Sequence, residues 1–211
     1  MGLPVLILGE SGSGKSASLR NFAPDEVVIY NVAGKPLPFR GGNALHRADN
    51  ASYDVITANM AKKKFRCYVI DDSQYLLAFE LFSRAGEKGY DKFTEMALHF
   101  YNLIQFVIRS MPPDCVVYFL HHTEELDGRL KAKTIGKMLD EKLTVEGLFS
   151  IVIMAKNEDG KHFFLTKSNG KNTVKTPMDM FAEEKIDNDL KAVDTTIREY
   201  YGMKGLQHES I

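Results

Sequence analysis

The sequence has few cysteines, almost no net charge and no long apolar run. Cys67 and Cys115 each begin an apolar run without metal-ligand spacing, so we expect reduced core residues of a cytosolic protein. A formal net charge of −1 provides no overall attraction to nucleic acid or membrane, so such a partner would need a local patch. No apolar run approaches the ~20 residues of a membrane-spanning helix.

The amino terminus lacks a basic segment and a signal-type apolar region, and Leu6 does not fit a myristoylation signal. We therefore expect a cytoplasmic protein with no membrane partner. A chain of 211 residues suits one substantial domain and is short for two. It has no internal repeat or low-complexity linker, so the sequence predicts a single domain over residues 1–211.

Residues 9–16 read Gly-Glu-Ser-Gly-Ser-Gly-Lys-Ser and match the phosphate-binding pattern G-x-x-x-x-G-K-[ST] at every fixed position. An apolar run at 3–8 precedes this loop, and a predicted helix over 15–21 follows it. The glycines allow successive N–H groups to turn inward around a phosphate. The alternative is a chance glycine-rich turn, against which the complete pattern and its strand–loop–helix context both argue.

The loop predicts an ATP and Mg²⁺ site with distinct roles for its residues. Lys15 reaches the β- and γ-phosphates, Ser16 offers its hydroxyl to Mg²⁺, and the N-terminus of the following helix favours the anion. The expected nucleotide contacts are Gly9, Glu10, Ser11, Gly12, Ser13, Gly14, Lys15, Ser16 and Ala17.

A second strand is predicted at 27–30, followed by a turn-rich stretch at 31–43. Lys35 and Arg40 in this stretch either touch phosphate or are solvated loop charges. A helix over 51–61 ends in the basic run 62–66, which favours a solvated helix C-terminus over a nucleic-acid contact.

The apolar strand at 67–70 ends in two aspartates, as expected for the partner of a phosphate loop. We assign Asp71 to the metal, directly or through its water. Asp72 either polarises the attacking water as a general base or caps the next helix. The extra strand between the phosphate loop and this acidic strand favours the ATPase branch of phosphate-loop folds over the simple kinase arrangement.

Helices are predicted over 74–84 and about 93–108, the second with an apolar and aromatic stripe for packing against the sheet. A strand at 116–120 then ends in two histidines. Either His121 or His122 is positioned to sense the γ-phosphate, and a histidine simply hydrogen-bonded in a loop is the alternative. Strand register decides which of the two points to the site.

The stretch 124–137 reads as a mobile polar loop, followed by a helix over 138–147, a strand at 149–154 and a returning hairpin strand at 162–166. An acidic helical tail spans about 180–201. The fold class is α/β, a mainly parallel central sheet flanked by helices with a C-terminal β-hairpin. Cationic candidates for nucleic-acid contact in the loop are Arg129, Lys131, Lys133 and Lys137, and Lys171 and Lys175 lie in a later basic stretch.

With these motifs in view, nearly all of the chain resembles a phage-type, single-domain RecA-like P-loop ATPase of the single-strand annealing recombination group. The resemblance rests on residues 9–16, on Tyr-Val-Ile-Asp-Asp-Ser-Gln-Tyr-Leu at 68–76, on Tyr-Phe-Leu-His-His-Thr-Glu at 118–124, and on Lys-Ala-Lys-Thr-Ile-Gly-Lys-Met-Leu at 131–139. The first motif is shared by a vast superfamily, and the last two are more telling.

The resemblance implies an ATP- and Mg²⁺-dependent protein, in the host cytoplasm if phage-encoded, that binds single-stranded DNA. It also implies a homo-oligomeric ring or filament and a single-stranded DNA-binding protein as a further partner. His121 or His122 takes the place of the polar sensor, and the loop after it that of a DNA-binding loop. Lys171 and Lys175 resemble lysines that act across a subunit interface.

One departure concerns hydrolysis. Larger recombinases carry a catalytic glutamate just after the second strand, where this chain has Asn31-Val32-Ala33. Either Asp72 replaces that glutamate or hydrolysis is slow. Two other functions stay open. One is a small-molecule or nucleotide kinase, whose lid is expected to carry arginines that hold the acceptor. The other is a nucleotide-gated adaptor with little turnover.

Overall fold

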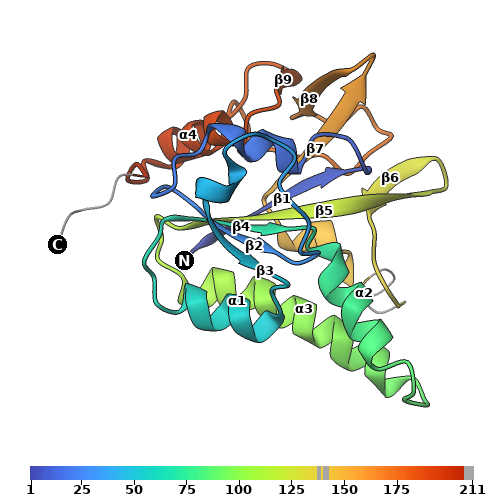
Figure 1. The fold of residues 1–211 in the computed structure, drawn as a ribbon. Coiled ribbons are helices and arrows are strands. Elements are labelled where there is room, and N and C mark those ends of the chain that lie inside the picture. Colours follow the sequence, from blue (N-terminus) through green and yellow to red (C-terminus); the bar gives the residue numbers. More distant parts are fainter. Residues whose placement is uncertain (137–138, 140–142, 207–211) are drawn as a thin grey trace.

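The computed structural model describes residues 1–136, 139 and 143–206, and these form one mixed sheet with helices on both faces (Figure 1). The strands are β1 (Leu3–Gly9), β2 (Val28–Asn31), β3 (His46–Asp49), β4 (Cys67–Asp71), β5 (Val116–Leu126), β6 (Arg129–Ala132), β7 (Ile151–Glu158), β8 (Lys161–Leu165) and β9 (Lys185–Asp187). The helices are α1 (Tyr53–Met60), α2 (Gln74–Ser83), α3 (Asp91–Ser110) and α4 (Leu190–Tyr201), with short 3₁₀ helices η1 (Ser16–Asn21), η2 (Gly42–Ala44) and η4 (Val145–Leu148).

The strand order is β3-β2-β4-β5-β1-β7-β8-β9, and β6 pairs with β5. The strands from β3 to β7 in this order run parallel, whereas β8, β9 and β6 pair antiparallel with their neighbours. The predicted α/β class, with a mainly parallel sheet and a β7–β8 hairpin, is confirmed. Because β5 lies between β1 and β4, the carboxyl ends of these three strands meet at one edge.

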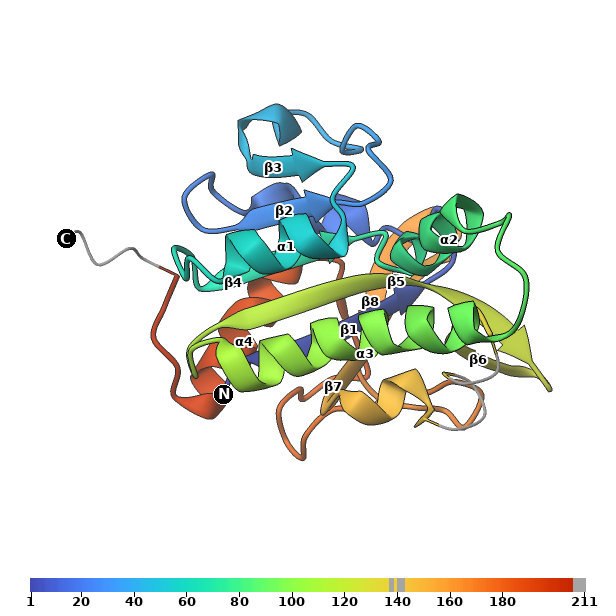
Figure 2. The same ribbon diagram turned by 90° about the horizontal axis from the view of Figure 1, so that it is seen from below.

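Alternating side chains along the strands form two cores, one on each face of the sheet. On β1, Leu6 and Leu8 pack with residues of α1, α2 and α3, whereas Val5 and Ile7 face residues of η1 and α4. Figure 1 shows α4 on the opposite side of the sheet from α1 and α3, and Figure 2 shows α1 and α3 side by side. The two layers cover both faces of the sheet and leave its carboxyl edge for a site.

The long helix α3 confirms the predicted packing stripe. Met96, Phe100, Ile104 and Val107 recur at spacings of three and four and are all buried. Side chains at these spacings lie on one helix face, which here covers the sheet. The helix ends just before Pro112, which cannot continue the hydrogen-bond ladder.

Several predicted boundaries are wrong. The element after the phosphate loop is the 3₁₀ helix η1, not an α-helix, and α4 begins only at Leu190, where Asp189 caps it through the amides of Lys191 and Ala192. Strand β5 does not stop at Leu120 but runs on to Leu126. Of the helix predicted over 138–147, positions 138 and 140–142 lie outside the described residues, and 145–148 are 3₁₀.

Three short strands, β3, β6 and β9, were not predicted. Each has three or four residues and mixes charged with apolar side chains, so its sequence carries little strand periodicity. β3 and β9 pair at the two edges of the sheet, and β6 pairs with β5. These pairings are tertiary contacts. Local sequence therefore could not reveal them.

The fold shows where the two cysteines lie and how apolar its helices are. Cys67 and Cys115 are both buried and unpaired by any disulfide. In the part of the chain that the structure describes, no helix is both long and apolar enough to cross a membrane.

Candidate functional site

The phosphate loop leaves β1 at Gly9 and enters η1 at Ser16, in a shape that requires glycine at two positions at least. A Cβ atom at Gly9 would lie 2.4 Å from the Ser13 hydroxyl oxygen and 3.0 Å from the carbonyl oxygen of Ala155, a backbone atom that cannot rotate away. Gly14 has φ +97°, a left-handed conformation that side chains disfavour. The loop is therefore shaped by its glycines, as the motif predicts.

Lys15 is folded back onto this loop. Its ammonium group donates to the carbonyl oxygens of Gly9 at 2.8 Å and Glu10 at 2.9 Å, and the residue is buried. Burial lowers its pKa to about 8. Among the described residues no carboxylate forms an ion pair with Lys15, and the buried Ser13 hydroxyl has no hydrogen-bond partner. Both groups fit an incoming phosphate.

The two residues expected at the metal lie together. The Ser16 hydroxyl donates to Asp71 Oδ1 at 2.9 Å, joining the loop to the end of β4. Burial and the neighbouring Asp72 raise the pKa of Asp71 to about 6. No group of three or more His, Cys, Asp or Glu ligands occurs among the described residues. A hydroxyl and a carboxylate beside a phosphate loop fit Mg²⁺, which prefers oxygen and takes further oxygens from phosphate and water.

Asp72 sits in a left-handed conformation, φ +58°, which turns its carboxylate into the site. Its Oδ1 accepts from His122 Nε2 at 3.1 Å, and its Oδ2 forms a 2.8 Å ion pair with Lys35. Burial alone would raise the pKa of Asp72, but the bonds from His122 and Lys35 outweigh it and hold that pKa at about 2. A carboxylate this acidic is a weak proton acceptor.

The helix-cap interpretation of Asp72 is wrong. The residue at the N-cap position of α2 is Ser73, and no side chain caps that helix. The Asp72 carboxylate is instead engaged by Lys35 and His122.

The two histidines of β5 point to opposite faces. His121 is fully buried, and its Nε2 donates to the carbonyl of Lys133 at 2.8 Å while its Nδ1 accepts from the Ser73 hydroxyl at 2.9 Å. Burial lowers the pKa of His121 to about 4, so the ring is neutral near pH 7. Of these two histidines of β5, His122 is the one that lines the cleft with the phosphate loop. Neighbouring side chains on a strand point to opposite faces, so only one of the two histidines can face the cleft. The sequence alone did not show which one.

A cleft of about 410 Å³ joins these groups. Its walls bring together residues of the phosphate loop, the end of β2 and the loop after it, the end of β4, the middle of β5 and the start of β8. The lining residues are Ser11, Gly12, Ser13, Gly14, Lys15, Ser16, Ala17, Asn31, Lys35, Pro36, Pro38, Asp71, Asp72, His122 and His162.

Asn31 occupies the end of β2, where the resemblance implies a glutamate in larger recombinases. Its amide donates to the Lys35 carbonyl and to Asp49, both at 2.7 Å, so it fixes the loop that carries Lys35. Among the described lining residues the carboxylates are Asp71 and Asp72 alone. Among these described residues, the end of β2 therefore supplies an amide and no carboxylate.

The sequence indicated Lys35 as a candidate for the cleft, but it did not indicate His162. His162 Nδ1 donates to the Ser13 carbonyl at 3.1 Å, so β8 closes one side of the loop. The available signal was the Asp159-Gly160 turn, because a strand that returns antiparallel to β7 starts at the carboxyl edge of the sheet, where the phosphate loop also lies. Arg40 does not line the cleft.

The stretch expected to be a mobile DNA-binding loop is a β-hairpin, so that structural prediction is wrong. Residues 123–126 of β5 pair antiparallel with 129–132 of β6, and the hairpin projects from the body of the protein (Figure 1). Arg129 donates to the carbonyl of Asn172 at 3.3 Å, and Lys131 lies 3.6 Å from Glu124. Lys133 is exposed, and Lys137 lies outside the described residues.

Lys171 and Lys175 are exposed. They lie on the segment between β8 and β9, which forms backbone hydrogen bonds with both this hairpin and β7. The Leu130 amide donates to the Lys171 carbonyl at 2.9 Å, and Lys175 exchanges two backbone hydrogen bonds with Val152. Lys171 and Arg129 thus lie on neighbouring segments. The basic stretch that contains Arg129 and the one that contains Lys171 are far apart in the sequence, but they lie next to each other at the hairpin.

A short path links the cleft to the hairpin. The His122 carbonyl accepts from the Lys133 amide at 2.9 Å, and the Lys133 carbonyl accepts from His121. The residue that faces the phosphate loop and the first residue after β6 are therefore directly hydrogen-bonded.

No protein-family model matches this chain, and no curated protein matches it either. The geometry of the site is therefore the main guide to its function. That geometry comprises a phosphate loop, a hydroxyl–carboxylate pair, a His–Asp–Lys cluster and a hairpin hydrogen-bonded to the same strand.

Proposed function

We propose that the chain is a RecA-like, Mg²⁺-dependent P-loop ATPase that couples nucleotide state to single-stranded DNA binding in phage DNA recombination, annealing or replication. The observation that carries the proposal is the 2.9 Å hydrogen bond from Ser16 to Asp71 beside the buried Lys15. The position of β5 between β1 and β4 supports it, since β5 brings His122 to the same edge.

ATP binds with its β- and γ-phosphates in the loop, where Lys15 turns from the carbonyls of Gly9 and Glu10 towards them. Ser16 and Asp71 would hold Mg²⁺, which would supply positive charge beside the phosphates. His122 faces the γ-phosphate and is kept in place by Asp72. Lys35 adds a second cation to the cleft and reaches the phosphates while it remains paired with Asp72.

Hydrolysis is slow in the absence of a partner. A general base should have a pKa near the working pH, whereas the pKa of Asp72 is about 2. Asn31 supplies an amide where a carboxylate would activate water. Asp72 therefore orients His122 and Lys35 and orders the attacking water, and DNA or a second subunit raises the rate.

The β5–β6 hairpin and the segment beside it form the DNA surface. Exposed Arg129, Lys133 and Lys171 contact the phosphate backbone, since neutralising phosphates dominates nucleic-acid affinity. A shift of His122 on binding ATP reaches the hairpin through its carbonyl bond to the Lys133 amide. Lys175 contacts the neighbouring subunit of a ring or filament, as the family resemblance implies.

The proposal is tested by fluorescence anisotropy of labelled single-stranded DNA with the full chain, Mg²⁺ and either a slowly hydrolysed ATP analogue, ADP or no nucleotide. We expect at least tenfold tighter binding with the ATP analogue than with ADP. Equal affinity in all three conditions would contradict the coupling. Duplex DNA and RNA of equal length serve as controls for nucleic-acid type.

The amide at Asn31 also favours a second candidate, a nucleotide-gated adaptor that binds ATP and a protein partner with little turnover. Tight ATP binding without hydrolysis under every nucleic-acid condition would favour it. The kinase alternative has less support, because no arginine is among the described residues that line the cleft.

A further inference from the structure

Tyr75, in the first turn of α2, lies against two groups of the cleft. The Lys35 ammonium is 5.0 Å from the centroid of its ring, and the centroid of the His122 ring is 5.6 Å away. Tyr75 does not line the cleft, whereas both of these neighbours do. It can therefore affect a ligand in the cleft through Lys35 and His122 without touching that ligand.

Hydrogen bonds tie the start of α2 to the neighbouring strand. The Tyr75 amide donates to the Asp72 carbonyl at 2.8 Å, and the Ser73 amide donates to the Leu120 carbonyl of β5 at 2.9 Å. The Ser73 hydroxyl, which is buried, also meets His121 Nδ1 at 2.9 Å. The backbone that carries the Tyr75 ring is therefore fixed relative to β5 and to the Asp72 carboxylate.

Lys35 needs a second contact to keep its ammonium at the cleft. Its side chain is more than half exposed, and its ion pair with Asp72 at 2.8 Å is of a kind that holds a flexible lysine only weakly. The face of an aromatic ring attracts a cation through the ring quadrupole. The carboxylate and the Tyr75 ring together define where the ammonium group lies.

The same ring limits the orientation of His122. The two ring planes are 88° apart, which is the edge-to-face arrangement that aromatic pairs favour. In this orientation His122 Nε2 donates to Asp72 Oδ1 at 3.1 Å. A smaller side chain at position 75 would give the imidazole room to turn away from Asp72.

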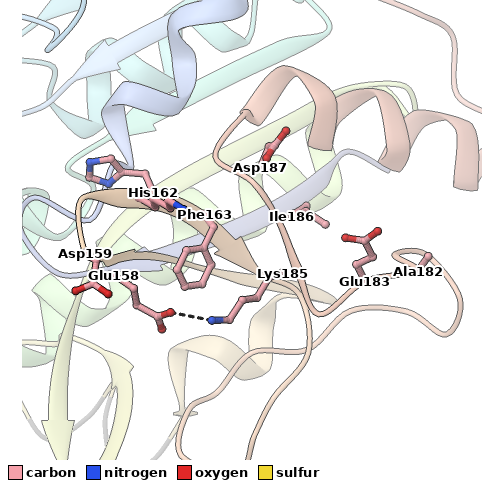
Figure 3. A pocket seen from close by; sticks show the side chains of 10 residues that line it. Glu158, Asp159, His162, Phe163, Ala182, Glu183, Lys185, Ile186 and Asp187 are labelled. Carbon is pink, nitrogen blue, oxygen red and sulfur yellow. Dashed lines mark hydrogen bonds and ion pairs between the residues drawn. The ribbon is translucent and has the colours of Figure 1, made fainter.

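The chain holds a second set of the same three groups away from the cleft. The Lys185 ammonium lies 4.5 Å from the centroid of the Phe163 ring and forms a 2.8 Å ion pair with Glu158. Figure 3 shows this pair beside the ring, in a hollow of about 780 Å³ over β8 and β9. None of these three residues lines the cleft, so they provide a matched control.

We propose that Tyr75 is a positioning residue of the nucleotide site, whose ring holds the Lys35 ammonium and the His122 imidazole on Asp72 so that both face the phosphates. The ring does this work, and the phenol hydroxyl is not needed. The inference rests on the proposed function, because it takes Lys35 and His122 to meet a bound nucleoside triphosphate.

The placement of Lys35 is tested by NMR on the nucleotide-free full chain. Protons above the face of an aromatic ring are shifted upfield, so the ε-methylene protons of Lys35 should be upfield of those of an ordinary exposed lysine. Tyr75→Leu should remove this shift and Tyr75→Phe should keep it, with Lys35→Ala identifying the signal. An unshifted Lys35 signal in the wild-type protein would overturn the inference without the need for any variant to fold.

The effect on the nucleotide is tested by calorimetry with ATP and Mg²⁺, with circular dichroism as a folding check. Tyr75→Leu should weaken ATP binding about two- to fivefold, the size of an exposed cation–π contact. Tyr75→Phe should restore wild-type affinity, and Phe163→Leu, the matched control, should not change it. In a Lys35→Ala background Tyr75→Leu should have less than half its effect, because residues that act through one another are not additive.

The outcomes separate this inference from the proposed function. If the wild-type chain binds no ATP, the proposed function fails and the inference fails with it. If ATP binds and Tyr75→Leu leaves its affinity unchanged, the phosphate site stands and the role of Tyr75 is overturned. An equal loss with and without Lys35, or a loss in Tyr75→Phe as large as that in Tyr75→Leu, would also overturn it.

Discussion

His122 Nε2 lies 3.1 Å from Asp72 Oδ1, although 50 positions separate the two residues in the chain. The contact joins the residue just after β4 to the middle of β5, and Lys35 holds the other carboxylate oxygen. Because β5 continues from His122 into the hairpin, a ligand that shifts this pair acts on the strand that carries the proposed DNA surface.

His122→Asn should uncouple DNA binding from nucleotide state while leaving ATP affinity within about threefold, since Lys15, Ser16 and Asp71 are untouched. The ratio of DNA affinities in the ATP and ADP states should fall to about one. Anisotropy with both nucleotides measures that ratio, and His46→Asn, at an exposed histidine on β3, is the control. A wild-type ratio in His122→Asn would contradict the role of the pair.

Lys15→Ala should weaken ATP binding at least 100-fold, because the buried ammonium is the cation nearest the loop. Lys35→Ala, at the exposed cation of the same cleft, should cost less than tenfold. Calorimetry with circular dichroism as a folding check measures both. Equal, small losses would show that the loop does not hold the phosphates as proposed.

The lowered pKa of Lys15 also predicts a pH dependence. With a pKa of about 8 in the free protein, Lys15 is protonated at pH 7 and loses its proton as pH rises through 8. ATP affinity should therefore fall between pH 7 and pH 9, with proton uptake on binding above pH 8. Titrations in two buffers of different ionisation enthalpy measure that uptake, and its absence would contradict a role for the ammonium group.

Arg129→Ala and Lys171→Ala should each reduce the salt slope of single-stranded DNA binding by about one, since each cation neutralises about one phosphate. Lys62→Ala and Lys64→Ala, in the basic run after α1, are matched controls and should leave the slope unchanged. If instead the controls change the slope and the two test variants do not, the DNA surface lies at the end of α1.

His121 predicts acid sensitivity of the fold. Its pKa is about 4 in the folded protein and about 6.5 when unfolded, so the unfolded state binds the extra proton between these values. The stabilisation is complete above pH 6.5 and is lost as pH falls towards 4, by about 3 kcal/mol. Urea unfolding from pH 7 to pH 4 measures it. His121→Gln should be less stable at pH 7 but show a flatter pH profile, whereas an unchanged slope would contradict the assignment.

The turn at residues 9–16, the position of Asp71 at the end of β4 and the sheet class could be predicted from sequence because each has a local signal. A fixed spacing defines residues 9–16, and a buried strand followed by carboxylates defines the end of β4. The helix α3 was likewise readable from its period of three and four. These features depend on residues that are neighbours in the chain.

The rest of the site depends on pairing between distant strands. Which histidine faces the cleft follows from the register of β5 against β1, where Gly9 lies opposite His122. His162 reaches the loop only because β8 extends the sheet on that side. The mobile loop predicted after His122 is a hairpin, since β5 continues past the core edge and β6 returns along it.

The central claim is that nucleotide turnover is linked to single-stranded DNA. The most direct test is steady-state ATP hydrolysis with Mg²⁺, measured without nucleic acid and with single-stranded DNA, duplex DNA or RNA, using Lys15→Ala as the blank. The account predicts slow basal hydrolysis that single-stranded DNA raises at least severalfold and duplex DNA does not. A rate that is the same in all four conditions, or no hydrolysis above the blank, would contradict it.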